Sequence, residues 1–249
     1  RAELQELLEE EIKLQQIQEL PMKMMQFVSL INPTDAIHAI DRIIDKRKDA
    51  ILIHNSSFMT GLYYELSGLC QTENCLTILA ALEIVKNRGY EISKKDYHTG
   101  FSDVCEMTGL MGRWQKLQSY PDVICDTGHN ADGFKCIRQQ LNYIHNKLNQ
   151  ELHIVFGMVN DKDISSVLEL LPKDATYYFT KASVKRALPE DELMKMASEA
   201  GLKGTSYPTV ADAVRAAKEN CPPKDFIFVG GSNFIVADLL ANRDTLNLY

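Results

Sequence analysis

Polar side chains that could take part in chemistry lie at one turn in the second half of the sequence, Cys125-Asp126-Thr127-Gly128-His129-Asn130. Asp126 follows the apolar run 123–125, so an Asp at this strand end could accept hydrogen bonds from ribose hydroxyls or orient a base. His129 could bridge to a phosphate or carry a proton, and Asn130 could cap the next helix, whose N-terminus favours anions. The alternative is that Asp126 and Asn130 are only turn and cap residues. Both interpretations stay open from these residues alone.

Three further turns follow predicted strands. In Gly157–Asp163, Gly157 allows a sharp exit from the strand and Asp163 is predicted to be a helix N-cap. The next turn holds the cations Lys181, Lys185 and Arg186. They would suit a carboxylate or phosphate, or they form a solvated surface. Gly230-Gly231-Ser232 lies between a strand and a helix, and tight backbone packing is a simpler reading than a phosphate loop.

The segment Gly109-Leu110-Met111-Gly112-Arg113-Trp114-Gln115 precedes the first of these strands. Two glycines stand before an Arg and the only Trp of the chain. The pattern is typical either of a hinge that carries a functional Arg113 or of an Arg stacked on Trp114 for structural reasons.

The elements that must position these turns alternate regularly from residue 121 onward. Strands are predicted over 123–126, 152–157, 176–180, 204–207 and 226–230, and helices near 131–148, 163–171, 189–200, 209–219 and 233–241. Such alternation predicts βαβ units with right-handed crossovers. We therefore expect an α/β fold, a Rossmann-like, mostly parallel sheet with flanking helices.

The first half is more mixed. Leucines and isoleucines at near-helical spacing predict an amphipathic helix over 4–20, and a second helix is expected from Thr34 to about residue 48. Strands are predicted over 50–53 and within 62–69, and a helix over 74–87. Ser93 is predicted to cap a further helix that runs to about Met107, with Asp96 at its third position.

Composition excludes several classes of protein. The 249 residues carry 27 Lys and Arg against 34 Asp and Glu, a formal charge of −7, which argues against nucleic acid or anionic membrane as a partner. No apolar run approaches the roughly 20 residues of a membrane span. The six cysteines form no C-x-x-C pair, so we expect small buried thiols in a reducing, cytoplasmic compartment and no metal site.

Several catalytic motifs are absent from the printed sequence. It contains no Gly-Lys dipeptide and hence no G-x-x-x-x-G-K-[S/T] loop, and neither G-x-S-x-G nor H-E-x-x-H occurs. A self-contained nucleotide triphosphatase or hydrolase is therefore not expected.

Several ordered motifs together resemble folylpolyglutamate synthase, and the bifunctional dihydrofolate synthase form of the Mur ligase superfamily is most similar. The resemblance covers about residues 62–249. It is carried by Gln71-Thr72-Glu73-Asn74, by 109–115, by Asp126-Thr127-Gly128-His129-Asn130, by Gly157-Met158 with Asp161-Lys162-Asp163, by Arg186-Ala187-Leu188-Pro189 and by Val229-Gly230-Gly231-Ser232.

The resemblance implies an ATP-dependent amide ligase. In this family ATP phosphorylates a carboxylate of dihydropteroate or folate, and the amino group of L-glutamate attacks the acyl phosphate. By motif match, Asn74 and Asp126 would hold the adenosine portion, and Arg113 would reach the phosphates and stabilise the developing charge. His129 would lie close to the phosphates.

The same resemblance suggests the remaining partners. The C-terminal domain would close over the nucleotide and help to bind glutamate, with Lys185, Arg186 and Ser232 as candidate substrate-binding residues. Arg113 and His129 are the candidate catalytic residues. The family is usually monomeric, so a monomer is expected.

The sequence departs from the family in one respect. The family's P-loop and its Mg²⁺ ligands belong to an N-terminal ATPase domain, and residues 1–60 lack its motifs. We therefore expect three parts: a helical segment of unknown role over 1–48, the tail of the central ATPase-type domain over 49–111, and a C-terminal Rossmann-like ligase domain over 112–249. Such a fragment is expected to be inactive alone.

Two other functions compete with this one. A non-catalytic Rossmann-like nucleotide-binding module would keep the same nucleotide-facing residues. A small-molecule oxidoreductase or transferase fits less well, because the opening glycine fingerprint is absent.

Overall fold

The computed structural model describes residues 41–45, 50–55, 59–160 and 163–248. The chain divides into two compact units between Leu110 and Met111, and each is described by itself. The predicted helix over 4–20 lies outside the described residues. The predicted boundaries at 48/49 and 111/112 stay predictions.

The first unit begins with a three-stranded antiparallel sheet, β1 (Asp41–Asp45), β2 (Ala50–Asn55) and β3 (Met59–Tyr64). The predicted helix from Thr34 to residue 48 is wrong for Asp41–Asp45, because these residues pair with Ala50–His54 as a strand. Adjacent β-branched Ile43 and Ile44 favour an extended backbone, and a polar stretch separates them from the next apolar run. Residues 34–40 and 46–48 of that predicted helix lie outside the described residues.

Three helices complete this unit: α4 (Cys70–Asn87), α5 (Lys94–Ser102) and α6 (Val104–Thr108). The predicted capping box is confirmed, since Ser93 Oγ accepts the Asp96 N–H and Asp96 Oδ2 accepts the Ser93 N–H at 2.8 Å. The helix predicted to reach Met107 instead ends at Ser102, and α6 follows after Asp103. The strand predicted within 62–69 stops at Tyr64.

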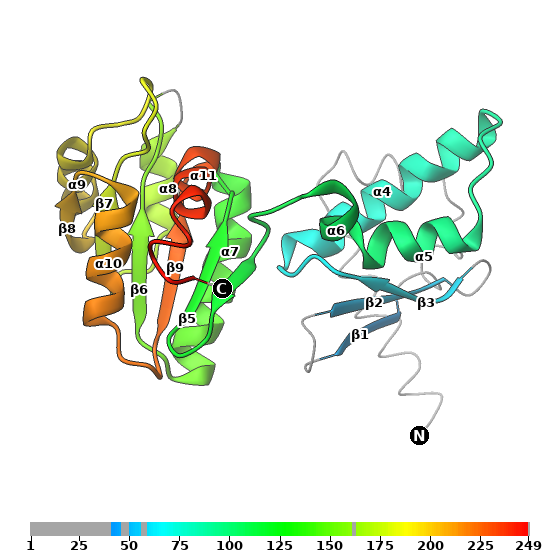
Figure 1. Ribbon diagram of the computed structural model, residues 1–249, viewed down its shortest axis with the longest axis horizontal. Coiled ribbons are helices and arrows are strands. Elements are labelled where there is room, and N and C mark those ends of the chain that lie inside the picture. The colour runs from blue at the N-terminus through cyan, green and yellow to red at the C-terminus, as the bar shows by residue number, and fades with distance from the viewer. Residues whose placement is uncertain (1–40, 46–49, 56–58, 161–162, 249) are drawn as a thin grey trace. The chain divides into compact units, whose positions relative to one another are not determined.

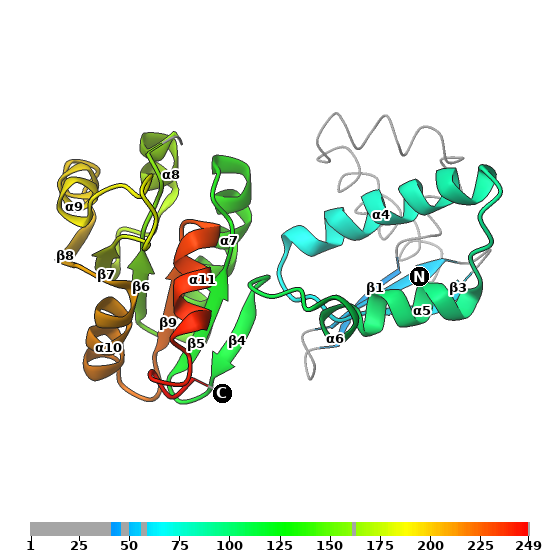
Figure 2. The same cartoon turned by 45° about the horizontal axis from the view of Figure 1, so that its top comes forward.

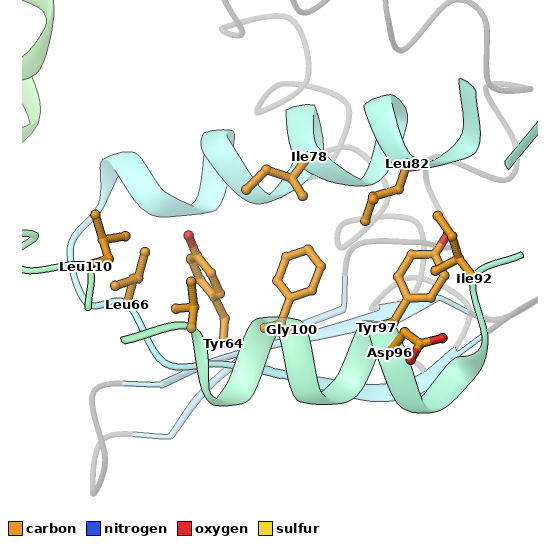
Figure 3. Close-up of a pocket in the computed structure, with 11 residues that line it drawn as sticks. Tyr64, Leu66, Ile78, Leu82, Ile92, Asp96, Tyr97, Gly100 and Leu110 are labelled. Atoms are coloured by element: carbon orange, nitrogen blue, oxygen red, sulfur yellow. The ribbon is translucent and has the colours of Figure 1, made fainter. Parts of the chain in front are cut away.

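An apolar cavity of about 380 Å³ lies between α4 and α5 (Figure 3). Ile78 and Leu82 of α4 face Tyr97 of α5 across it. Among its lining residues Asp96 alone carries a charge, and that carboxylate is engaged by Ser93. The cavity therefore offers hydrophobic surface and no reactive group.

The second unit is a six-stranded sheet in the order β4-β5-β9-β6-β7-β8 (Figure 1). Its strands are β4 (Gln115–Gln118), β5 (Asp122–Asp126), β6 (Leu152–Phe156), β7 (Ala175–Thr180), β8 (Lys203–Tyr207) and β9 (Phe226–Gly230). Only β4 runs antiparallel to its neighbour, and the other strands pair in parallel. The predicted α/β class with a mostly parallel sheet is confirmed, whereas β4 was not predicted.

Helices cover both faces of this sheet (Figures 1 and 2). They are α7 (Ala131–Leu148), α8 (Ile164–Leu170), α9 (Glu190–Glu199), α10 (Val210–Asn220) and α11 (Asn233–Ala241). Side chains of α7, α8 and α9 pack in one apolar core, and those of α10 and α11 in a second. Successive strand residues alternate between the two cores: Phe226 and Phe228 join the first, and Ile227 and Val229 the second.

The six cysteines lie in the described residues, and the expectation of buried thiols holds for three of them, whereas Cys70, Cys105 and Cys136 are partly exposed. Cys75, Cys125 and Cys221 are buried, and burial raises the pKa of the Cys125 thiol to about 12. No described helix is both long and apolar enough to span a membrane.

A buried histidine lies on the α10 side of the sheet. His153 is 8% exposed, and its Nδ1 lies 3.0 Å from the hydroxyl of Tyr178. Burial lowers the pKa of His153, although the charges of Asp225 and Glu151 act to raise it. The folded protein therefore favours the neutral imidazole, whereas the unfolded chain takes up a proton near pH 6.5.

We expect the free energy of unfolding to fall as the pH is lowered below about 6.5, because the unfolded state then binds more protons. Urea unfolding followed by circular dichroism at pH 7.5 and pH 5.5 measures this change. His153→Gln should show a smaller loss between the two pH values than the parent. Tyr178→Phe keeps the buried imidazole and should retain the loss, so an identical loss in parent and His153→Gln would refute the assignment.

Candidate functional site

The candidate site lies where β5 ends and α7 begins, at the carboxyl edge of the parallel sheet (Figure 1). Asp126 is the last residue of β5, and Asn130 is the N-cap of α7. Asn130 Oδ1 accepts the Gly133 N–H at 2.8 Å, which confirms its predicted capping role.

Asp126 links two turns of the backbone. Its Oδ2 accepts the Trp114 N–H at 2.8 Å, and its Oδ1 accepts the Gly128 N–H at 2.7 Å. Burial raises the pKa of the Asp126 carboxyl, while these two N–H groups and the charge of Arg113 act to lower it. The carboxylate thus holds the segment 112–115 against the turn that carries His129.

Gly112 is held in the same way by its own peptide groups. Its carbonyl accepts the Thr127 N–H at 2.9 Å and the Thr127 hydroxyl at 3.0 Å. Its N–H donates to Gln115 Oε1 at 2.8 Å. Gly112 has φ +75°, and a Cβ there would lie 2.8 Å from Thr127 Cγ2 and 2.9 Å from Val236 Cγ1. Both the backbone angle and the lack of space require glycine.

Trp114 anchors the far side of this segment. Its ring centroid lies 5.8 Å from that of Phe228 and 6.4 Å from that of Phe226, so the indole packs on β9. The aromatic contacts of the Trp114 indole are thus with β9. Arg113 is exposed and acts on Asp126 through its charge.

His129 is half-buried beside Asp126. Its Nδ1 lies 3.1 Å from the Thr127 carbonyl oxygen. When Nδ1 carries the proton and donates to that carbonyl, Nε2 is left as the acceptor of the ring. The Thr127 carbonyl can only accept a hydrogen bond, so it favours the tautomer of His129 with the proton on Nδ1. Nε2 is then the ring nitrogen that can accept a hydrogen bond or a proton.

Two of the three cationic side chains in the loop after β7 contact other residues. Lys181 Nζ forms an ion pair with Glu190 Oε2 at 2.8 Å. The Arg186 guanidinium lies 4.8 Å from the ring centroid of Phe234, at the start of α11. Lys185 is exposed. The structure thus brings Arg186 to the end of α11 that Ser232 caps, and it pairs Lys181 elsewhere.

Ser232 has a structural partner. It is 2% exposed, and its Oγ accepts the Ile235 N–H at 3.2 Å as the N-cap of α11. The neighbouring Gly231 has φ +106° and packs directly against Gly157 and Phe156. Tight packing of the glycine pair is therefore confirmed, and the Ser232 hydroxyl already accepts one hydrogen bond.

Asn74 lies in the first unit. It is exposed on α4, and its Nδ2 donates to Gln71 Oε1 at 2.9 Å. Gln71 is buried and also accepts the Tyr64 hydroxyl at 3.4 Å. The Gln-x-x-Asn element is therefore an internally bonded turn of the helix.

Within the described residues, no cluster of three or more His, Cys, Asp or Glu side chains is arranged to hold a metal ion. Arg113 and His129 lie in the two turns that Asp126 joins, and a guanidinium and the N-terminus of a helix are groups of the kind that bind anions. The sequence had singled out Arg113, Asp126 and His129, but not Gln115 or Thr127. Gln115 bonds to Gly112 three residues away along the chain, whereas Thr127 reaches Gly112 from the turn after β5.

Comparison with known families agrees with this arrangement. Residues 112–233 match the family described as Mur ligase, glutamate ligase domain. These residues hold all of the β5–α7 site as well as the turns after β6, β7 and β9. The second unit is therefore a glutamate ligase domain of the Mur ligase type.

The chain is similar to part of known folylpolyglutamate and dihydrofolate synthases. It is 27% identical over 163 residues to a dihydrofolate synthase/folylpolyglutamate synthase of Buchnera aphidicola, covering 65% of this chain and 37% of that protein. E. coli FolC in complex with DHPP and ADP is 25% identical with a TM-score of 0.61, covering 79% and 44% of the two chains. A Mycobacterium tuberculosis folylpolyglutamate synthase shares the fold, with a TM-score of 0.67 over 85% and 48% of the two chains. The chain thus spans less than half the length of these relatives.

We expect Gly112→Ala to destabilise the second unit by about 2–3 kcal/mol, because it adds a steric clash to an unfavourable φ. Urea unfolding followed by Trp114 fluorescence measures the change. Gly201→Ala is the matched control, since Gly201 has φ +82° but no atom within 4 Å of a Cβ. It should cost only about 1 kcal/mol. Equal losses for the two variants would show that the space around Gly112 is not restrictive.

Proposed function

We propose that this chain forms the glutamate ligase part of an ATP-dependent amide ligase that adds L-glutamate to dihydropteroate or a folate through an acyl phosphate. The observation that supports the proposal is the site at the end of β5. There Arg113 and His129 lie in the two turns that the partly buried Asp126 carboxylate joins, and α7 begins just after them. The names of the relatives supply the reaction class.

In the proposed reaction Arg113 contacts the phosphates of the nucleotide. Its guanidinium is exposed and its backbone is fixed on both sides, so it can meet negative charge without reorganising. A guanidinium that stabilises the charge developing on a transferred phosphoryl group lowers the barrier of that step. His129 Nε2 is the second group of the turn for a phosphate oxygen or its proton.

In the proposed complex, Asp126 and Asn74 contact the adenosine part of the nucleotide. Asp126 already accepts two backbone N–H groups, but each carboxylate oxygen keeps a second lone pair that a ribose hydroxyl could use. Asn74 remains a proposed adenosine contact in the first unit. Mg²⁺ would neutralise the phosphates when bound. Because the described residues hold no carboxylate cluster, we assign its ligands to the ATPase-type domain of the family.

The glutamate substrate is assigned to the turns after β7 and β9. Arg186 is held over Phe234 and can pair with a carboxylate, as can the exposed Lys185. Ser232 would contribute through the lone pair that the cap leaves free. We further propose that the protein is a monomer and acts in the cytoplasm, where thiols stay reduced.

The printed sequence has no G-x-x-x-x-G-K-[S/T] loop, so we propose that these 249 residues alone do not catalyse the ligation. Incubation with ATP, Mg²⁺, L-glutamate and a folate should release no phosphate above the buffer rate. Release that depends on both glutamate and the folate would contradict this.

We expect Arg113→Ala to weaken ADP binding to the chain about tenfold or more and to leave adenosine binding unchanged, because a charge-assisted bond to phosphate is lost. Isothermal titration calorimetry with the two ligands measures both affinities. Arg215→Ala, on α10 where Arg215 pairs with Asp212, is the matched control and should bind ADP as the parent does. Unchanged ADP affinity in Arg113→Ala would contradict the assigned role.

A further inference from the structure

The backbone on both sides of Arg113 is held by hydrogen bonds to Thr127, Gln115 and Asp126. On the N-terminal side, Thr127 bonds twice to the Gly112 carbonyl, and Gln115 accepts the Gly112 N–H. On the C-terminal side, Asp126 accepts the Trp114 N–H. Three side chains therefore determine how the peptides that flank Arg113 are oriented.

This backbone has a conformation that local preference does not supply. Gly112 has φ +75° and Trp114 has φ +47°, so Arg113 lies between two residues in the left-handed region. A bulky residue such as Trp occupies that region only when surrounding contacts hold it there. The indole stack on Phe226 and Phe228 and the bonds from Asp126, Thr127 and Gln115 are those contacts.

The hydroxyl of Thr127 and the amide of Gln115 add to a link that already exists. The Thr127 N–H donates to the Gly112 carbonyl at 2.9 Å and by itself connects the turn after β5 to the segment 112–115. The hydroxyl is a second donor to the same carbonyl, and the Gln115 amide fixes the N–H of the same residue. Together they restrict rotation of the peptides around Gly112, and hence the direction in which Arg113 leaves the backbone.

We propose that Thr127 and Gln115 are positioning residues that set where the Arg113 guanidinium is presented to a phosphate. The inference deepens the proposed function and rests on it for the identity of the phosphate ligand. In this role the two residues act through the backbone of Arg113. Loss of either contact should leave the fold intact and let the segment 112–115 sample other conformations.

The first test needs no nucleotide. Trp114 is the only tryptophan of the 249-residue chain, so its fluorescence reports on this segment alone. Thr127→Val and Gln115→Met each remove one contact at nearly constant volume, and we expect each to raise acrylamide quenching of Trp114 about twofold. Thr127→Ser keeps the hydroxyl and should return quenching to the parent value. Thr205→Val makes the same chemical change on the exposed strand β8 and should have no effect.

The second test separates positioning from general damage to the site. In calorimetry, Thr127→Val and Gln115→Met should weaken ADP binding about fivefold, the loss of one neutral hydrogen bond, and leave adenosine affinity unchanged. Equal weakening of ADP and adenosine, or quenching unchanged in both variants, would overturn the proposal. If the parent binds no ADP, the proposed function fails. The quenching result then still decides whether Thr127 and Gln115 hold this segment.

Discussion

One partly buried carboxylate organises the candidate site. Asp126 ends a strand inside the sheet and accepts an N–H from each of two turns that are otherwise separate in the sequence. Burying a carboxylate is unfavourable unless hydrogen bonds compensate, and these two N–H groups provide that compensation. The same bonds bring Arg113 and His129 to one edge of the sheet. An ordinary structural requirement, the satisfaction of a buried charge, therefore assembles the groups that could bind a nucleotide.

The sheet makes this arrangement possible. β5 and β9 are parallel neighbours, so Asp126 and Gly230 end at the same edge. Apolar residues alternate between two cores along each strand, and helices cover both faces. Because Phe226 and Phe228 are two residues apart on β9, their rings lie on the same face of the sheet, and the indole of Trp114 packs against both. The segment that carries Arg113 is thus attached to the core, although Arg113 itself is exposed.

Strand and helix alternation from residue 121 predicted the parallel sheet well, since period and length identify buried strands between helices. Asn130, Asp163 and Ser93 were predicted as caps because capping chemistry is local. The short strand β4 was missed, because Gln115–Gln118 is polar and becomes a strand only by pairing with β5. Strand β1 was predicted as part of a helix for a different reason, because isoleucines recur there at helical spacing. The contact of Thr127 with Gly112 joins two turns that are distant in sequence, which no local pattern encodes, whereas Gln115 bonds to Gly112 within the same turn.

Amide hydrogen exchange, followed residue by residue by NMR, tests the clamp at Asp126 most directly. If the carboxylate holds both turns, the Trp114 and Gly128 amides should exchange about as slowly as amides of the central strands β5 and β9, and Asp126→Ala should speed both together. Exchange of either amide in the parent at the rate of an exposed loop would contradict the account. So would an Asp126→Ala variant in which the two amides remain protected.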